Sequence, residues 1–152
     1  MTHDVADAYA NGKKKLLLLA LFLGLALLVP VLAHAEPQIW FRHVPEYGSF
    51  DDLKGKVSGV KRKKYRVAVY IEVFGGWWTK PTFAQPVVKI NKKKKWKSDI
   101  TTGGFDAEAT TIAAFLIPKG YSPPLLAGVF TLPNELDENA VAQAMVSRPV
   151  TP

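Results

Sequence analysis

Cysteine is absent from this chain of 152 residues, and histidine occurs only three times. Without cysteine the chain forms no disulfide, and it has neither a thiolate nucleophile nor a thiolate metal ligand. His3 and His34 lie before residue 36, which leaves His43 as the only histidine in the rest of the chain. We recognise neither a Ser-His-Asp nor a Cys-His arrangement, so we predict a non-enzymatic protein without a cofactor or a bound metal.

Charge is absent from an apolar run of 18 residues, Leu16 to Ala33. The run directly follows Lys13, Lys14 and Lys15 and ends at Ala33-His34-Ala35. As a helix it would extend about 27 Å at roughly 1.5 Å per residue, close to the hydrocarbon thickness of a bilayer, about 30 Å. The run is either a transmembrane anchor or, with cleavage after Ala35, a secretory signal peptide, and its length favours the anchor.

The lysines before the run indicate that the N-terminus stays in the cytoplasm. We therefore expect an inner-membrane protein whose C-terminal domain is periplasmic or extracellular. The expected parts are a cytoplasmic tail over 1–15, the anchor or signal peptide over 16–35, a stalk or lead-in strand over 36–50 and a periplasmic β-sandwich over 51–152. In the lead-in, Trp40 and Phe41 are typical of aromatic residues at a membrane interface.

Long helical periodicity is also missing from the exported part, where short apolar strands alternate with Gly/Pro turns. The clearest strand is 65–74, in which Tyr65, Val67, Val69, Ile71 and Val73 share one face. Weaker strands are predicted over 87–90, 96–100, 111–117, 126–132 and 141–147, and one helical turn over 134–139. We expect 53–60 to pair with 65–74. This pattern predicts an all-β fold, an immunoglobulin-like β-sandwich.

The net charge of +7 is concentrated in two basic runs. Nucleic acid is not expected as a partner of an exported domain, so anionic lipid headgroups of the bilayer or acidic neighbouring subunits are the predicted contacts, unless the runs are simply solvated turns. The second run is expected at a hairpin turn, where lysines are unusual because tight turns favour Gly, Asn and Asp. The runs are Lys61, Arg62, Lys63 and Lys64, and Lys92, Lys93, Lys94 and Lys95.

Aromatic residues are the other interaction candidates. Trp77 and Trp78 are adjacent, so in a strand one ring enters the core while the other faces outward. An exposed ring can stack on a sugar or anchor a protein interface, whereas two packed rings would have only a structural role. Trp96, beside the second basic run, and Tyr121 are candidates of the same kind.

Three carboxylates, Asp99, Asp106 and Glu108, are the closest acidic group. Such residues can act as a glycosidase pair or bind Ca²⁺, but neither the spacing of a Ca²⁺ loop nor a phosphate-binding context around Gly103-Gly104 is present. We therefore favour turn capping as their role.

Several stretches together carry a family resemblance: YRVAVYIEV from Tyr65, GGWWTKPTFAQP from Gly75, SDITTGGFDAEAT from Ser98, IAAFLIPKGYSPP from Ile112, and Leu132-Pro133. From Leu53 to Arg148 the chain resembles a domain of secreted and cell-envelope bacterial proteins that sometimes stands beside carbohydrate-active modules. The resemblance implies a β-sandwich accessory or interaction domain outside the cytoplasm. The run Lys92–Lys95 departs from it, because such domains usually carry an Asn, Asp or Gly turn there.

Two functional hypotheses follow. In the first, the chain is a membrane-anchored accessory subunit whose sandwich stabilises or bridges a larger membrane protein complex, such as a respiratory or photosynthetic one. In the second, it is a secreted carbohydrate-binding domain that uses Trp77, Trp78 and Tyr121.

Overall fold

The computed structural model describes residues 35–150 of the chain. The expected tail, the apolar run and the lysines Lys13, Lys14 and Lys15 lie outside these residues. Within residues 35–150, no helix is both long enough and apolar enough to cross a membrane.

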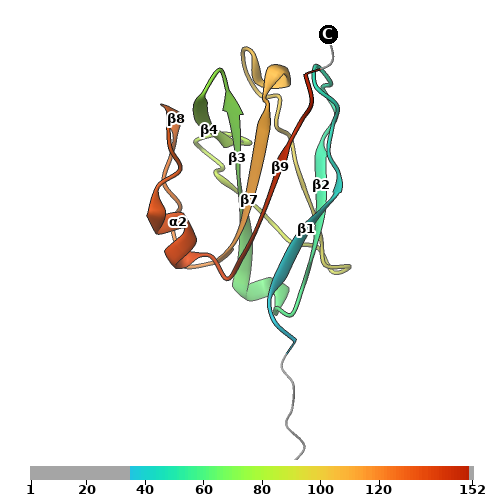
Figure 1. The fold of residues 1–152 in the computed structure, drawn as a ribbon. Helices are drawn as coiled ribbons and strands as arrows, with labels where there is room; N and C mark the ends of the chain where they lie inside the picture. The colour runs from blue at the N-terminus through green and yellow to red at the C-terminus, as the bar shows by residue number, and fades with distance from the viewer. Residues whose placement is uncertain (1–34, 151–152) are drawn as a thin grey trace, which may run out of the picture. The chain divides into compact units, whose positions relative to one another are not determined.

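Nine strands and three short helical segments make up the described chain (Figure 1). The strands are β1 Gln38–His43, β2 Leu53–Ser58, β3 Tyr65–Val73, β4 Gly76–Lys80, β5 Val87–Val88, β6 Lys95–Ser98, β7 Thr111–Pro118, β8 Ala127–Val129 and β9 Ala142–Ser147. The helical segments are the 3-10 turns η1 Arg62–Lys64 and η2 Asp106–Glu108, and the helix α2 Asn134–Asn139, where one helical turn is predicted.

The strands form two antiparallel sheets. A three-stranded sheet has the order β1-β2-β6, and a six-stranded sheet has the order β8-β4-β3-β7-β9, with β5 also paired to β3. Figure 1 shows β1 and β2 on the right, β3 and β7 in the middle and α2 on the left. The prediction of an all-β sandwich is confirmed.

The main core lies between the two sheets. Val67, Val69 and Ile71 of β3 are fully buried there, on the face that the alternating pattern predicts. Burying a side chain of this size stabilises the fold by about 1.5–3 kcal/mol. The other sheet and the flanking loops add their inward side chains, among them Ile39, Leu53, Val57, Ile90, Trp96 and Ile100.

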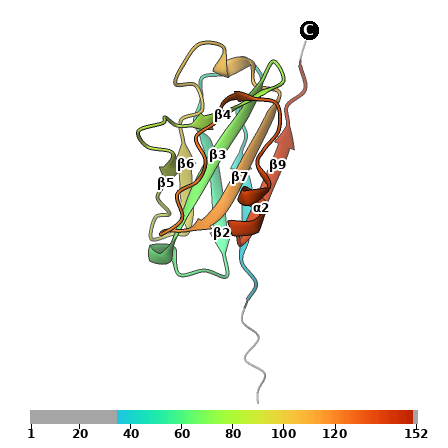
Figure 2. The same cartoon turned by 90° about the vertical axis from the view of Figure 1, so that its left-hand side faces the viewer.

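The six-stranded sheet is buried on its second face as well. There Tyr70 of β3 and Phe115 of β7 meet edge to face, with ring centroids 6.0 Å apart. Leu136 of α2 is fully buried against this face, together with Trp77 and Leu126. The segment that includes α2 crosses in front of the sheet (Figure 2), which explains why β3 and β7 are apolar on both sides.

The predicted pairing of residues 53–60 with residues 65–74 is wrong. Strand β2 pairs with β1 and β6, whereas β3 pairs with β4, β5 and β7 in the other sheet. The turn η1 carries the chain from one sheet to the other, so Leu53 and Val57 of β2 face the apolar side of β3 across the core. The two strands are partners in packing and not in hydrogen bonding.

Residues 91–95 form a turn, as predicted, but its flanking strands β5 and β6 belong to different sheets. The Asn91 side chain makes the turn, because its Oδ1 accepts hydrogen bonds from the backbone N–H groups of Lys93 and Lys95 at 2.9 and 3.0 Å. One Asn thus supplies the turn chemistry that the lysines lack.

The lead-in segment contributes a strand, because β1 pairs with β2 over most of its length. Lysines occupy the outer face of this sheet. In the register of β2 and β6, Lys54 lies opposite Lys97 and Lys56 lies opposite Lys95. Like charges directly opposite each other are destabilising, and only Lys97 has a carboxylate partner, Asp52 at 2.8 Å.

Candidate functional site

An aromatic cleft of about 640 Å³ is present in the described chain. It lies where β3 turns into β4, and its other walls are the loop after β4, the loop before η2 and the segment at β8. The aromatic cleft therefore collects side chains from three stretches that are far apart in the sequence, residues 73–83, 102–106 and 128–130.

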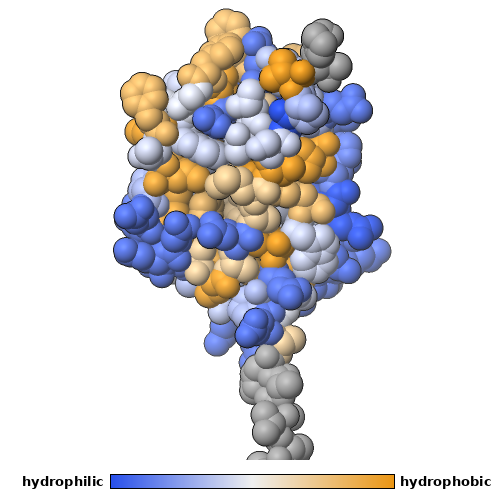
Figure 3. Space-filling view, viewed as in Figure 1, coloured by the Kyte–Doolittle hydropathy of each residue, from blue (hydrophilic) through white to orange (hydrophobic). Residues whose placement is uncertain are grey.

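Five aromatic side chains line the aromatic cleft and remain exposed. Four are phenylalanines, whose side chains cannot form hydrogen bonds. In Figure 3, pale orange rings project from the upper end of the molecule. Contiguous exposed apolar surface of this kind marks binding sites, whereas single exposed residues are ordinary. The exposed fractions are 71% for Phe74, 38% for Trp78, 50% for Phe83, 64% for Phe105 and 84% for Phe130.

Phe74 is placed at a conformational cost. It forms a two-residue hairpin turn with Gly75 between Val73 and Gly76, and both turn residues have positive φ, 52° and 81°. Such turns favour Asn or Gly at the first position, because a bulky side chain in the left-handed region costs about 1–2 kcal/mol. The Phe74 ring packs only edge-on against Phe105, 5.5 Å between centroids, and is mostly exposed. Neither its backbone conformation nor its burial explains a Phe at this position.

A buried ion pair lies at the wall of the aromatic cleft. Lys80 Nζ pairs with Asp106 Oδ2 and also donates a hydrogen bond to Thr102 Oγ1 at 3.2 Å. Asp106 Oδ2 in addition accepts a hydrogen bond from the backbone N–H of Gly103 at 2.8 Å. Because Lys80 and Asp106 are the only charged residues in the lining, the aromatic cleft is electrically neutral overall.

Arg148 supports the same wall of the aromatic cleft through hydrogen bonds to the backbone. Its guanidinium donates hydrogen bonds to the carbonyl oxygens of Ala107 within η2 at 3.0 Å, of Ala109 directly after η2 at 2.7 Å, and of Glu46 at 3.0 Å. Burial lowers the pKa of Arg148, and neighbouring Tyr47 partly opposes this effect. The residue is only 4% exposed, so it fixes the loop that carries Phe105 and Asp106 rather than contacting a ligand.

The adjacent tryptophans lie as the alternation predicts. Trp77 is buried in the same apolar cluster as Leu136 of α2, whereas Trp78 is exposed and lines the aromatic cleft. Trp96 is only 3% exposed and packs edge-on against Phe41, so it is not available at a surface. Tyr121 is half-buried away from the aromatic cleft, and burial together with Glu135 and Glu138 raises its pKa.

The three carboxylates do not face a common ligand. Asp99 caps a turn by accepting a hydrogen bond from the Thr101 N–H at 2.9 Å, and Asp106 is held by Lys80. Exposed His43 lies 3.8 Å from Asp51. Among the residues that the structure describes, no three His, Asp or Glu side chains are grouped to hold a metal ion.

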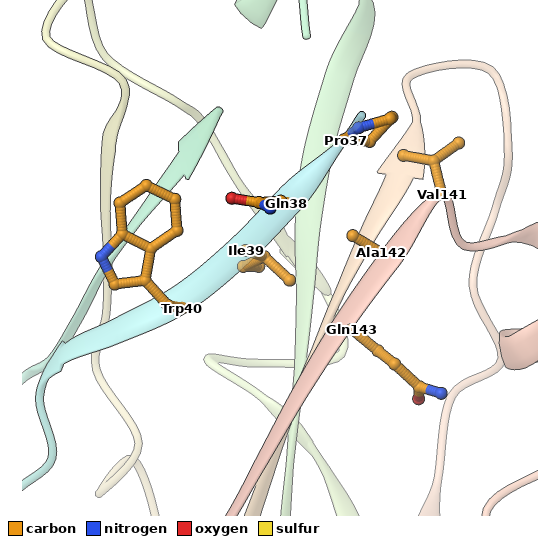
Figure 4. Close-up of a pocket in the computed structure, with 7 residues that line it drawn as sticks. All are labelled: Pro37, Gln38, Ile39, Trp40, Val141, Ala142 and Gln143. Atoms are coloured by element: carbon orange, nitrogen blue, oxygen red, sulfur yellow. The ribbon is translucent and has the colours of Figure 1, made fainter. Parts of the chain in front are cut away.

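A second hollow of about 580 Å³ lies between β1 and β9, at the edges of the two sheets (Figure 4). Its lining contains no charged residue. Trp40 and Gln143 point away from each other, and Ile39 lies between the two strands. Trp40 and Phe41 are both half-buried on β1. This edge groove lacks the converging side chains of the aromatic cleft.

The sequence analysis identified Trp78 but missed the phenylalanines of the aromatic cleft and Lys80. Phe74 and Phe130 were predicted within strands 65–74 and 126–132, but β3 ends at Val73 and β8 at Val129, so both lie just beyond a strand. Phe83 and Phe105 lie in loops, where no periodicity marks them. The two basic runs lie on η1 and on the 91–95 turn, away from the aromatic cleft.

No protein-family model, no curated protein and no solved structure matches this chain.

Proposed function

We propose that this chain is a non-enzymatic accessory subunit that binds an apolar, uncharged segment of another protein in a membrane complex. The aromatic cleft is the proposed binding site. The observation that carries the proposal is the convergence of five exposed aromatic side chains, from three stretches of the chain, around one hollow. Residues 16–33 are the proposed membrane anchor, with the sandwich on the periplasmic side of the inner membrane.

The chemistry of the lining favours an apolar protein segment. Phenylalanine offers only hydrocarbon surface, and the one ion pair in the lining is already satisfied internally. A charged ligand would therefore lose its hydration without gaining a partner charge. Aromatic anchors at the centre of an interface commonly dominate binding to protein partners.

The proposed fold subclass is the immunoglobulin-like sandwich. The strand orders β1-β2-β6 and β4-β3-β7-β9 correspond to the orders A-B-E and C′-C-F-G of such domains. In these domains, binding loops cluster at the ends of the sandwich, which is also where the aromatic cleft lies.

A neutral carbohydrate is the second candidate ligand. It is favoured by Trp78, whose ring can stack on a sugar, and by the hydroxyl groups of Thr82 and Thr102 in the same lining. Trp77 and Tyr121 are not part of this candidate site, because neither lines the aromatic cleft.

Site-specific photocrosslinking in native membranes tests the proposal. A photoreactive phenylalanine analogue is placed at position 130 in the aromatic cleft, or at position 50 as a control. Phe50 is 78% exposed but does not line the aromatic cleft. We expect position 130 alone to crosslink one membrane protein, and Phe83→Ala to abolish that product. Intact mass of the purified chain then shows whether residues 1–35 are retained.

Two results would overturn the proposal. One is equal crosslinking from positions 50 and 130, which would mean that contact is not specific to the aromatic cleft. The other is a chain that begins at Glu36, has no crosslinked partner and is retained on a neutral polysaccharide through Trp78. That result would establish the carbohydrate-binding alternative.

A further inference from the structure

A small basic pocket of about 210 Å³ lies at the other end of the sandwich from the aromatic cleft. Five of its six lining residues are cationic and none is acidic; they are Arg62, Lys63, Arg66, Lys89 and Lys119, with Ile90 as the apolar member. Ile90 is only 3% exposed, so the pocket is backed by the core.

Backbone hydrogen bonds hold these cations together. The Lys119 N–H donates to the carbonyl oxygen of Lys64 at 2.8 Å, which joins the end of β7 to η1. Arg66 lies on β3 opposite Ile117 of β7. Three separate stretches thus contribute cations to one pocket through ordered backbone, and not through a disordered tail.

None of these cations forms an ion pair with a carboxylate of the described residues. The ion pairs within residues 35–150 are His43–Asp51, Lys80–Asp106 and Lys97–Asp52, and none includes a residue of the basic pocket. Mutual repulsion among unpaired cations disfavours this arrangement unless an anion is bound.

We propose that the basic pocket binds a phosphoryl group. Arginine presents a planar fork of donors that matches phosphate oxygens, and lysine adds point charge, so their combination around a small hollow suits a compact multivalent anion. A phospholipid headgroup and free inorganic phosphate both carry this group.

The place of the basic pocket in the fold favours a phospholipid as the source. The described chain enters the sandwich at the same end as η1 (Figure 1), and Gly59 abuts the backbone of Ala35 and Glu36. The second basic run reaches this end too, because Lys94 Nζ donates to the carbonyl oxygen of Val60. A membrane anchor ending at Ala33, two residues before Ala35, would keep the basic pocket near the lipid headgroups. The choice of a phospholipid over free phosphate therefore rests on the membrane anchoring in the proposed function.

Phosphate binding itself does not depend on the proposed function. Arg66 and Phe74 lie eight residues apart along β3 and its turn, about 26 Å at roughly 3.3 Å per residue, so the two sites are tested separately.

The test uses the full chain in neutral detergent micelles, with backbone amide NMR shifts of Lys64, Lys89 and Lys119 as the readout. The micelles receive inorganic phosphate, phosphatidylglycerol or, as a lipid without phosphate, diacylglycerol, at constant ionic strength. The variant Arg62→Gln/Lys119→Gln removes two charges of the basic pocket. The matched control Arg42→Gln/Lys54→Gln removes one arginine and one lysine from the exposed outer face of β1 and β2.

We expect the pocket variant to raise the dissociation constant for the phosphoryl ligand about tenfold or more, and the control to leave it nearly unchanged. Shifts with phosphatidylglycerol alone assign the site to lipid, whereas shifts with inorganic phosphate alone assign it to the free anion. An absence of shifts with either ligand, or equal weakening in both variants, would overturn the proposal. Lys63→Gln/Lys119→Gln, which changes two exposed side chains, replaces the first variant if that variant does not fold.

Discussion

Lys80 and Asp106, which lie 26 positions apart in the sequence, form an ion pair at the wall of the aromatic cleft. Both residues are buried, with exposed fractions of 6% and 8%. The ion pair joins the end of β4 to the start of η2, and so it holds Trp78 on one side in a fixed relation to Phe105 on the other.

Replacing Asp106 with Asn should lower the free energy of unfolding by about 3–5 kcal/mol, because Lys80 would remain buried without its counter-charge. Asp52→Asn breaks the exposed ion pair with Lys97 and should cost about 1 kcal/mol or less. Urea unfolding of both variants checks the difference. Equal losses would show that burial does not distinguish the two pairs.

Phe74→Asn should stabilise the fold by about 1 kcal/mol while it weakens binding at the aromatic cleft. Asn tolerates the positive φ of this turn position better than Phe does. Phe83 also lines the aromatic cleft, but its φ is not positive, so Phe83→Asn should weaken binding without stabilising the chain. Thermal unfolding together with crosslinking yield measures both effects. A destabilised Phe74→Asn variant would contradict the view that the native residue is kept for binding.

Gly55→Ala should destabilise the sandwich by about 1–3 kcal/mol, because the added Cβ would overlap the ring of Trp96. That ring is buried and cannot move aside easily. At Gly120 an added Cβ meets nothing within 4 Å, and the backbone is not in the left-handed region. Gly120→Ala should therefore be neutral or slightly stabilising in the same denaturation assay. Similar costs at the two positions would contradict the close packing of Trp96 on β2.

Tyr70 should make the chain less stable at alkaline pH. Burial raises the pKa of its phenol above the ordinary value of 10.0, and Tyr121 and Glu135 add to this effect. Above about pH 10 the unfolded chain releases this proton while the native chain keeps it, so this contribution to stability falls as the pH rises. Tyr70→Phe should cost about 1 kcal/mol near neutral pH, through the lost hydrogen bond to the Pro124 carbonyl, and that deficit should shrink above pH 10. A constant deficit across that range, measured by urea unfolding, would contradict the prediction.

Strand positions could be predicted from the sequence, because the alternation of side chains with a period of two is a local signal. The alternation in 65–74 correctly assigned Val67, Val69 and Ile71 to the core, and the adjacency of Trp77 and Trp78 correctly placed them on opposite faces. Strand pairing could not be predicted in the same way, since β2 and β3 follow each other in sequence but belong to different sheets. Hydrophobic pattern fixes which face is buried, but it does not determine which edge is paired.

The proposed binding site was predicted only in part for a related reason. Trp78 lies on a strand and stood out by residue type, whereas Phe74, Phe105 and Phe130 lie in or beside turns and come together only when three stretches meet. Trp96 was predicted as an interaction candidate at the surface, but its ring is buried. Its neighbouring lysines suggested a surface, but the alternation of β6 sends the ring inward beside Gly55.

The lysines of the three-stranded sheet have one more consequence. Strand β6 is an edge strand, and its outer face carries Lys95 and Lys97 directly beside Lys54 and Lys56 of β2. A second copy that added a strand to this edge through its own β6 would bring another row of ammonium groups against the first. Repulsion of this kind opposes edge-to-edge growth and aggregation. The facing lysines, which destabilise the single domain, therefore favour its solubility.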